Sequence, residues 1–327
     1  MAFFLAVDSR RSIRITEDST WTRTAGNVQS TRGWENLVKS IKEKECVPFL
    51  GAGASQGLPT GAALAKDWAE RVRYPYHDTD NLSSVMQYAV VMAFNHDANQ
   101  LKRALHRTVF SQVALTTDQL DIHHILARCD LPLYLTTNYD DFMVEALQRA
   151  GKRPTWNVSP WYSSGMDDDD DRRPPLPADD PTAERPLVFH LHGHHSIPHS
   201  MVLTEDDYID FHVRHARDGR DKSLTPEGDR AAIVPSYVRT RLRRAPLLFL
   251  GYSLRDSTFW TLFKSLMIAM PDGQRSSHVC LQLDPRVKRR AAVREYLDKR
   301  LGRQQIEIFW MSLEDFTAML DSRLRGT

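Results

Sequence analysis

The sequence predicts an α/β fold with a doubly wound parallel sheet, and two features of the chain support this. Short apolar runs alternate with stretches of helical periodicity along most of the 327 residues. Several of these runs also end in glycine or polar residues, as the strands of such sheets do at the edge where ligands bind. The predicted strands are Cys46–Leu50, Leu131–Thr137, a run from Leu187 into a histidine-rich turn, Met201–Thr204, Pro246–Leu250, His278–Leu283 and Gln305–Trp310.

Helical periodicity fills the stretches between the strands. Residues 74 to 130 carry three helical stripes and no strand signal, which predicts a small helical module inserted after the first strand–helix unit. No linker divides two large domains, so we expect one domain over 31–327, preceded by a short arm over 1–30 with an edge strand near Ser12–Ile15. The predicted helices are Gly33–Lys44, Ala62–Val72, Phe142–Ala150, Glu205–Phe211 with Thr204 as its cap, Ile233–Arg243, Thr258–Ala269, Val287–Leu301 and Leu313–Leu324.

Residues 163 to 186 are low in complexity and contain five consecutive aspartates, Asp167 to Asp171. Such a run repels itself and cannot bury a core, so we expect a flexible acidic loop. A metal site in this loop is a weaker alternative.

The composition excludes several classes of protein. A formal net charge of +1 gives no basic excess for direct nucleic-acid binding, and no apolar run reaches membrane-spanning length. The apolar start, Met1 to Val7, is too short for a signal peptide. Three isolated cysteines, Cys46, Cys129 and Cys280, suit a reducing cytoplasm and argue against a zinc site.

The first predicted strand runs into the stretch Gly51-Ala52-Gly53-Ala54-Ser55. Glycines spaced in this way allow a tight turn and let a ligand phosphate approach backbone N–H groups. A dinucleotide fingerprint would place a third glycine at Gln56, but the next glycine is Gly57. A plain strand–helix turn is therefore an equally good reading of this stretch alone.

Polar residues follow three more strands. Asn138 and Asp140 follow the second. A helix cap is the preferred role for Asp141, whereas for Asn138 a cap and a ligand contact are equal alternatives. Four histidines, His190, His192, His194 and His195, follow the third. His190 and His192 should point the same way along a strand, and one working histidine is favoured over a metal site because no further ligand completes a set. The fourth strand opens onto Gly251-Tyr252-Ser253-Leu254.

Taken in order, these strand ends resemble the sirtuin superfamily, whose NAD site is marked by a GAG-x-S loop, a T-x-N-x-D strand end, an H-G and a G-x-S. The resemblance covers roughly Val47 to Asp284. The two CxxC pairs of a zinc-binding deacetylase are absent, and Leu58-Pro59-Thr60-Gly61 stands where a deacetylase carries Pro-Asp-Phe-Arg. The chain is thereby similar to the SIR2-like branch of bacterial antiphage defence systems, with a Rossmann-like sheet.

The resemblance implies NAD+ as substrate, hydrolysed to nicotinamide and ADP-ribose, and no zinc or other metal. His192 would be the general base, with Asn138 and Asp140 beside it. The residues expected to bind the cofactor are Gly51, Ala52, Gly53, Ser55, Thr137, Gly251, Ser253 and Asp284. For Asp284 a helix cap is as good a reading as a contact to the adenosine ribose.

Members of that branch act as NAD-depleting effectors in antiphage defence that a trigger or partner activates. This implies a homo-oligomer, or a partner such as a HerA-like ATPase or an Argonaute-type protein. Two alternatives remain at this point: a non-catalytic sensor that binds NAD or ADP-ribose, and an ADP-ribosyltransferase with the same first step.

Overall fold

The computed structural model describes residues 31–162, 174–177, 179–218, 232–254, 260–261, 263–264, 277–285 and 289–326. Three predicted features lie wholly or largely outside this part of the chain: the arm over 1–30 with the predicted edge strand, the acidic loop over 163–186 and the helix Thr258–Ala269.

The predicted parallel sheet is confirmed, and every strand pairing in the described residues is parallel. Its seven strands lie in the order β3-β4-β2-β1-β5-β6-β7. β1 therefore has β2 on one side and β5 on the other, and the chain builds outward from β1 in both directions. The strands are β1 (Val47–Leu50), β2 (Leu133–Thr136), β3 (Thr155–Val158), β4 (Leu187–His190), β5 (Leu247–Leu250), β6 (His278–Gln282) and β7 (Ile306–Trp310).

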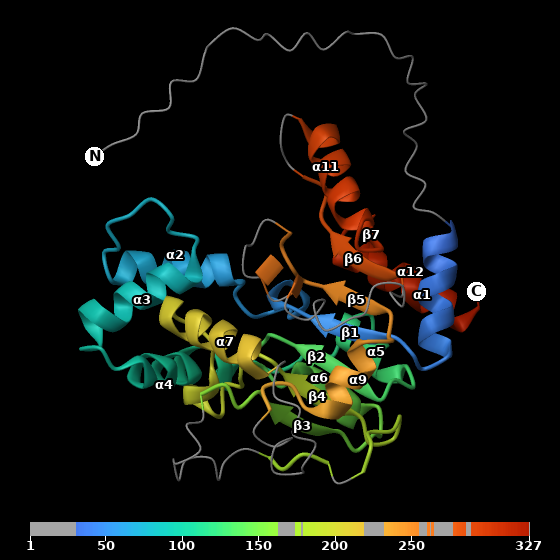
Figure 1. Cartoon of the computed structure of the whole chain (residues 1–327), viewed down its shortest axis with the longest axis horizontal. Coiled ribbons are helices and arrows are strands. Elements are labelled where there is room, and N and C mark those ends of the chain that lie inside the picture. The colour runs from blue at the N-terminus through green and yellow to red at the C-terminus, as the bar shows by residue number, and fades with distance from the viewer. Residues whose placement is uncertain are drawn as a thin grey trace, which may run out of the picture.

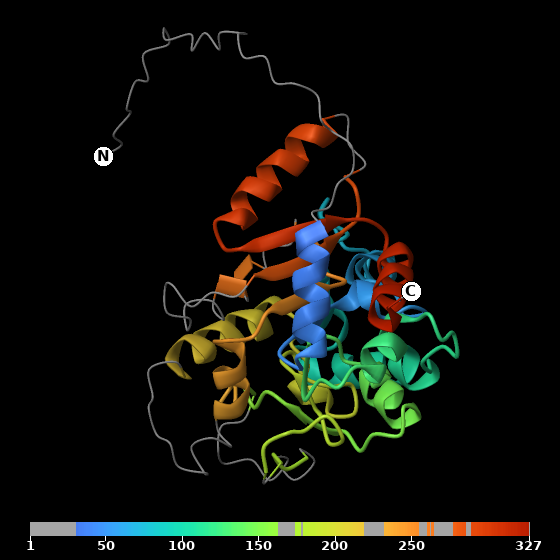
Figure 2. The same cartoon turned by 90° about the vertical axis from the view of Figure 1, so that its right-hand side faces the viewer.

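Helices cover both faces of the sheet (Figures 1 and 2). One apolar cluster joins the sheet to α1, α5, α6 and α12, and a second joins its other face to α7, α9 and α11. Burial on both faces explains why the central strands are continuous apolar runs. The helices are α1 (Thr31–Lys42), α2 (Gly61–Arg71), α3 (Leu82–Ala93), α4 (Ala98–Thr108), α5 (Ile122–Arg128), α6 (Phe142–Arg149), α7 (Glu205–Asp218), α9 (Ser236–Leu242), α11 (Arg290–Gly302) and α12 (Leu313–Arg325).

α2, α3 and α4 lie together beside the sheet and share a third apolar cluster (Figure 1). That cluster includes Leu203, which follows β4, and packs against Tyr139, which follows β2. α5, also within the stretch 74–130, instead packs against the sheet with α6 and α12. The three-helix group thus rests on the loops that leave the carboxyl ends of β2 and β4.

A buried ion pair joins this helical group to α7. Lys102 Nζ of α4 lies 2.8 Å from Asp207 Oδ1, and both side chains are almost fully buried. The other carboxylate oxygen of Asp207 accepts the backbone N–H groups of Leu203 and Thr204, while Thr204 Oγ1 accepts the N–H of Asp207. This reciprocal bonding confirms Thr204 as the cap of α7.

One strand prediction is wrong, and one strand was not predicted. Met201–Thr204 is a loop. It pairs with no strand in the described part of the chain, and Val202 N–H instead donates to the His192 carbonyl. Thr155–Val158 is a strand that was not predicted, and it forms the edge of the sheet beside β4. Its four residues, Thr-Trp-Asn-Val, alternate between polar and apolar, but the run is too short to mark a strand in sequence.

Candidate active site

The marked loops meet at one edge of the sheet. The loops over 51–55, 137–141, 191–196 and 251–254 follow β1, β2, β4 and β5, which are four neighbouring parallel strands. β1 and β5 also form the switch point, where the chain leaves the sheet in opposite directions. Ligands of open α/β sheets bind outside the carboxyl ends of the strands at this point. The topology thus brings together the four strand ends that the sequence marks.

Glycine allows the loops after β1 and β5 to touch through their backbones. Gly251 has a φ of +77°, and a Cβ atom on it would meet Ala54 N and Gly51 O. Gly53 N–H donates to the Gly251 carbonyl over 2.9 Å, and Gly51 N–H donates to the Leu250 carbonyl over 2.8 Å. These two N–H groups are therefore already used inside the protein in this arrangement. The prediction that Gly51 and Gly53 hold a pyrophosphate therefore stays a prediction, in which the contact is a close approach of the ligand to the backbone; Ala52 of the same loop is exposed.

Ser55 likewise faces the protein interior. Its Oγ donates to Asp140 Oδ2 over 2.8 Å and accepts a hydrogen bond from Asn138 Nδ2 over 2.8 Å. A hydroxyl has one proton, and Ser55 uses it in the hydrogen bond to Asp140. Ser55 is thus a link between Asn138 and Asp140, and its predicted contact to the cofactor stays a prediction.

The Asn138 side chain is fixed in one orientation. Its Nδ2 donates to Gly51 O over 3.1 Å and to Ser55 Oγ, so both amide hydrogens have partners. Oδ1 has no hydrogen-bond partner among the described residues. An amide oxygen is only an acceptor, so Asn138 can receive a hydrogen bond from a water or hydroxyl group of a ligand.

The backbone of Asn138 is held as firmly. Its N–H donates to Thr136 Oγ1 over 2.9 Å, and its carbonyl lies 3.0 Å from His190 Nδ1. Because a carbonyl only accepts, His190 carries its proton on Nδ1. Burial lowers the pKa of His190 to about 3, which keeps this ring neutral near pH 7.

Asp140, and not Asp141, caps the start of α6. Asp140 Oδ1 accepts the N–H of Phe142 over 3.1 Å, while Asp141 makes no side-chain cap bond. Asp141 instead contacts His194 and His195. The helix-cap role preferred for Asp141 is therefore wrong, because two imidazoles compete for its carboxylate.

His192 lies in a turn just beyond β4, against the aromatic rings of α7. The ring centroids of Tyr208 and Phe211 lie 5.5 and 5.1 Å from that of His192. Nε2 of His192 is buried and has no hydrogen-bond partner among the described residues. Burial, and then the charge of nearby His212, lower the pKa of His192 to about 3. The ring is therefore neutral near pH 7, and a neutral imidazole can accept a proton.

The expected common direction of His190 and His192 is also wrong. The His190 ring packs against Trp156 and His194, whereas the His192 ring packs against α7. β4 ends at His190, so the alternation of a strand does not extend to His192.

Tyr252 is a site residue that was not predicted, although it lies within the Gly251–Leu254 stretch after β5. Its hydroxyl donates to the Leu50 carbonyl over 2.8 Å and lies 2.9 Å from Thr137 Oγ1. Two of its ring carbons lie 2.8 and 2.9 Å from the position of a Cβ on Gly51. Tyr252 and Thr137 therefore join the loops after β1, β2 and β5, while Ser253 is exposed beside them.

Asp284 lies past the end of β6, one strand beyond this group. Its carboxylate pairs with Arg290 and Arg294 of α11, with nitrogen–oxygen distances of 3.0 Å to each. α11 begins at Arg290 and has Arg289 at its cap position, so the alternative reading of Asp284 as a helix cap is wrong.

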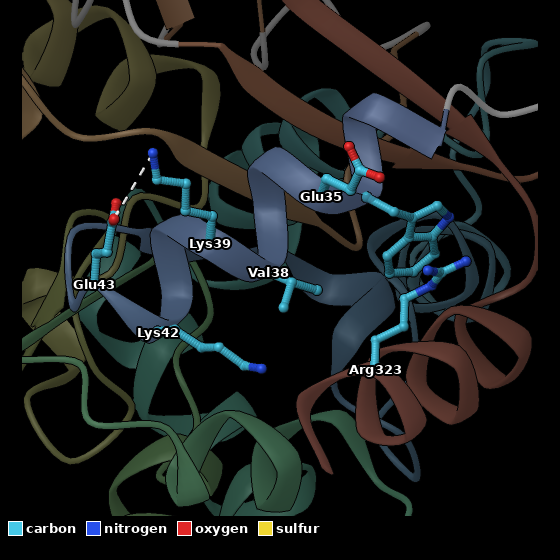
Figure 3. A pocket seen from close by; sticks show the side chains of 7 residues that line it. Glu35, Val38, Lys39, Lys42, Glu43 and Arg323 are labelled. Carbon is cyan, nitrogen blue, oxygen red and sulfur yellow. Dashed lines mark ion pairs between the residues drawn. The ribbon is translucent and has the colours of Figure 1, made fainter. Parts of the chain in front are cut away.

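A shallow groove lies away from these loops, between α1 and α12 (Figure 3). Val38, Lys42 and Arg323 line it, and the Lys39–Glu43 ion pair spans 3.8 Å on α1. Neither helix carries a predicted site residue.

A family model described as a SIR2-like domain matches residues 132–304, which is more than half of the chain. The chain belongs to the SIR2-like domain family. The match includes the strand ends that carry Asn138, His192 and Gly251, and β1 joins them through its pairing with β2 and β5.

Three relatives carry the same printed name, NAD(+) hydrolase ThsA. The chain is 24% identical over 249 residues to the protein of Acinetobacter baumannii (strain 532279), which covers 76% of this chain and 44% of the relative. The identity to the protein of Cytobacillus dafuensis is 25% over 248 residues, which cover 75% of this chain and 42% of the relative. The identity to the protein of Bacillus cereus (strain MSX-D12) is 24% over 252 residues, which cover 76% of this chain and 45% of the relative. The chain thus spans less than half the length of these relatives.

No helix among the described residues is long and apolar enough to cross a membrane.

Proposed function

We propose that the chain hydrolyses NAD+ to nicotinamide and ADP-ribose. The observation that carries this proposal is the Asn138 amide, whose two hydrogens are held by Gly51 and Ser55 so that Oδ1 remains as an acceptor. The names of the relatives support the same reaction.

In this reaction the bond between C1′ of the ribose and the nicotinamide nitrogen breaks, and its electron pair leaves with nicotinamide. The leaving group is cationic before cleavage, so it needs no protonation. A water oxygen forms the new bond to C1′ and loses one proton. Asn138 Oδ1 would accept a hydrogen bond from this water or from a ribose hydroxyl and fix its position.

His192 would be the base, acting on the water directly or through a ribose hydroxyl. Its Nε2 is a buried polar atom without a partner, which is costly until a donor arrives. A ribose hydroxyl supplies such a donor. Asp140 would act through Ser55 and Asn138, because its two oxygens already accept bonds from Ser55 and Phe142.

We further propose that Ala52, Thr137, Gly251 and Ser253 line the NAD+ site and that the chain is an NAD-depleting effector in antiphage defence. Activation by a trigger, through a homo-oligomer or a partner such as a HerA-like ATPase or an Argonaute-type protein, stays a proposal by family resemblance.

The test is separation of the products by chromatography after incubation of the purified chain with NAD+. Free ADP-ribose with equimolar nicotinamide supports hydrolysis. Protein-bound ADP-ribose supports a transferase, and intact NAD+ in the presence of measured NAD+ binding supports a sensor.

A further inference from the structure

The Asp141 carboxylate lies between two neighbouring histidines. Asp141 Oδ1 is 2.9 Å from His194 Nε2, and Oδ2 is 2.8 Å from His195 Nε2. Asp141 directly precedes α6, while the histidines lie on the turn after β4. The cluster therefore connects the loop that carries Asn138 to the turn that carries His192. Its own side chains have no part in the proposed reaction.

Local hydrogen bonds identify which nitrogen of each ring carries the proton. The backbone N–H of Ser196 donates to His194 Nδ1 over 3.2 Å, so the hydrogen of a neutral His194 is on Nε2, facing Asp141. His195 Nδ1 lies 3.0 Å from His106 Nδ1 of α4. Since His195 donates from Nε2 to the carboxylate, His106 supplies the proton of that second bond.

A divalent metal ion is the competing occupant, because the ligand atoms of Asp141, His194 and His195 lie within 4.8 Å of one another. A metal needs the lone pair of each Nε2. The Ser196 N–H instead places a proton on Nε2 of His194. Burial by itself would raise the pKa of Asp141, but the hydrogen bonds from His194 and His195 lower this pKa well below its usual range. The geometry thus favours a carboxylate that holds two N–H donors.

This cluster is tied to the two proposed catalytic residues by short stretches of chain. Asn138 stands three residues before Asp141. His192 stands two residues before His194, separated by Gly193, whose φ is +86° and where a Cβ would meet the Ser200 carbonyl. The His195 N–H also donates to the Tyr139 carbonyl over 3.0 Å. The turn and the loop can therefore shift little while the cluster is intact.

We propose that Asp141 is a positioning residue, which holds the loop carrying Asn138 against the turn carrying His192 through hydrogen bonds to His194 and His195. The inference rests on the proposed hydrolysis of NAD+. Asp141 would not contact the ribose or the attacking water. It would act by placing Asn138 and His192, which would contact them. His106 extends the same hydrogen-bonded group to α4.

Three variants test this. Asp141→Asn presents an amide N–H to one of the two ring N–H groups, so one bond is lost. His195→Leu removes one donor altogether. His195→Gln is the matched control, because an amide N–H can replace the Nε2–H donor but a glutamine side chain is a poor metal ligand.

We expect Asp141→Asn and His195→Leu to lower kcat by about 30-fold, with KM for NAD+ changed by less than about threefold, since misplacement costs the reaction step and not ground-state binding. His195→Gln should keep kcat within about threefold of wild type. NMR of the histidine ring nitrogens should show the wild-type chain with protons on Nε2 of both His194 and His195, and Asp141→Asn without one of them.

Stoichiometric metal in the wild-type chain that His195→Gln loses would overturn the proposal, as would unchanged kcat in both Asp141→Asn and His195→Leu. A wild-type chain that binds but never cleaves NAD+ would contradict the proposed function instead. The ring protons would then still report whether the Asp141 hydrogen bonds exist.

Discussion

Asn138 donates a side-chain hydrogen bond to the hydroxyl of Ser55 over 2.8 Å, although the two residues are 83 positions apart in the chain. The bond crosses from the loop after β2 to the loop after β1. It turns the amide so that Oδ1 is the atom left for a ligand.

Ser55→Ala should lower kcat for NAD+ hydrolysis by about 10- to 100-fold, because Asn138 loses the partner that orients it. Ser40→Ala is the matched control: this serine is also buried, but its hydroxyl donates to the Leu37 carbonyl within α1. Steady-state kinetics on both variants, with melting curves, measures the effect. Equal loss of activity in the two would contradict a specific role for Ser55.

Gly251→Ala should destabilise the protein beyond the cost of its backbone angle. Gly151→Ala is the control, because Gly151 has a similar φ of +79° and open space around it. We expect Gly151→Ala to cost about 1 kcal/mol from the left-handed conformation alone. Gly251→Ala should cost about 2 kcal/mol more, since its Cβ meets the backbone of Gly51 and Ala54. Denaturant unfolding measures both, and equal costs would show that the two loops do not pack as described.

Lys102→Met should lower the free energy of unfolding by about 3 kcal/mol, because it leaves the buried Asp207 carboxylate without its cation. The exposed Arg71–Asp67 pair, with a 2.8 Å contact, provides the control. Arg71→Met should change the free energy of unfolding by less than about 1 kcal/mol. Similar losses in the two variants would contradict the burial of the Lys102–Asp207 pair.

Stability should fall as the pH drops from about 6.5 toward 4. Burial lowers the pKa of His190 and of His192 to about 3 each, whereas in the unfolded chain both have an ordinary value of about 6.5. Between these values the unfolded state binds more protons, so acid favours unfolding, and stability is fully present above about pH 6.5. Melting temperatures from pH 8 to 4 measure this. A flat curve between pH 7 and 5 would show that neither ring is buried as found.

The order of the strand ends and the parallel sheet could be predicted because both leave local patterns. Each central strand is buried on both faces and so reads as a continuous apolar run, and each site loop begins where such a run stops. The alternation of strands and helices then fixes the class of fold. The edge strand β3 lacks a continuous apolar run, and for this reason it was not predicted.

The partners of the site residues could not be predicted, because they depend on contacts between distant segments. Ser55 resembles a phosphate-loop serine in sequence, but its hydroxyl donates a hydrogen bond to Asp140, 85 residues away. Asp141 resembles a helix cap in sequence, but in the structure its carboxylate contacts His194 and His195 on the turn after β4. The pKa of His192 depends on burial by α7, a later segment of the chain, so the residues around His192 in sequence do not indicate it.

The proposed hydrolysis depends on Asn138 and His192. The most direct measurement is the rate of nicotinamide release from saturating NAD+ by the wild-type chain and by Asn138→Ala and His192→Ala. We expect each variant to lose about two to four orders of magnitude in rate while keeping the wild-type melting temperature within a few degrees. Wild-type rates in either folded variant would contradict the mechanism.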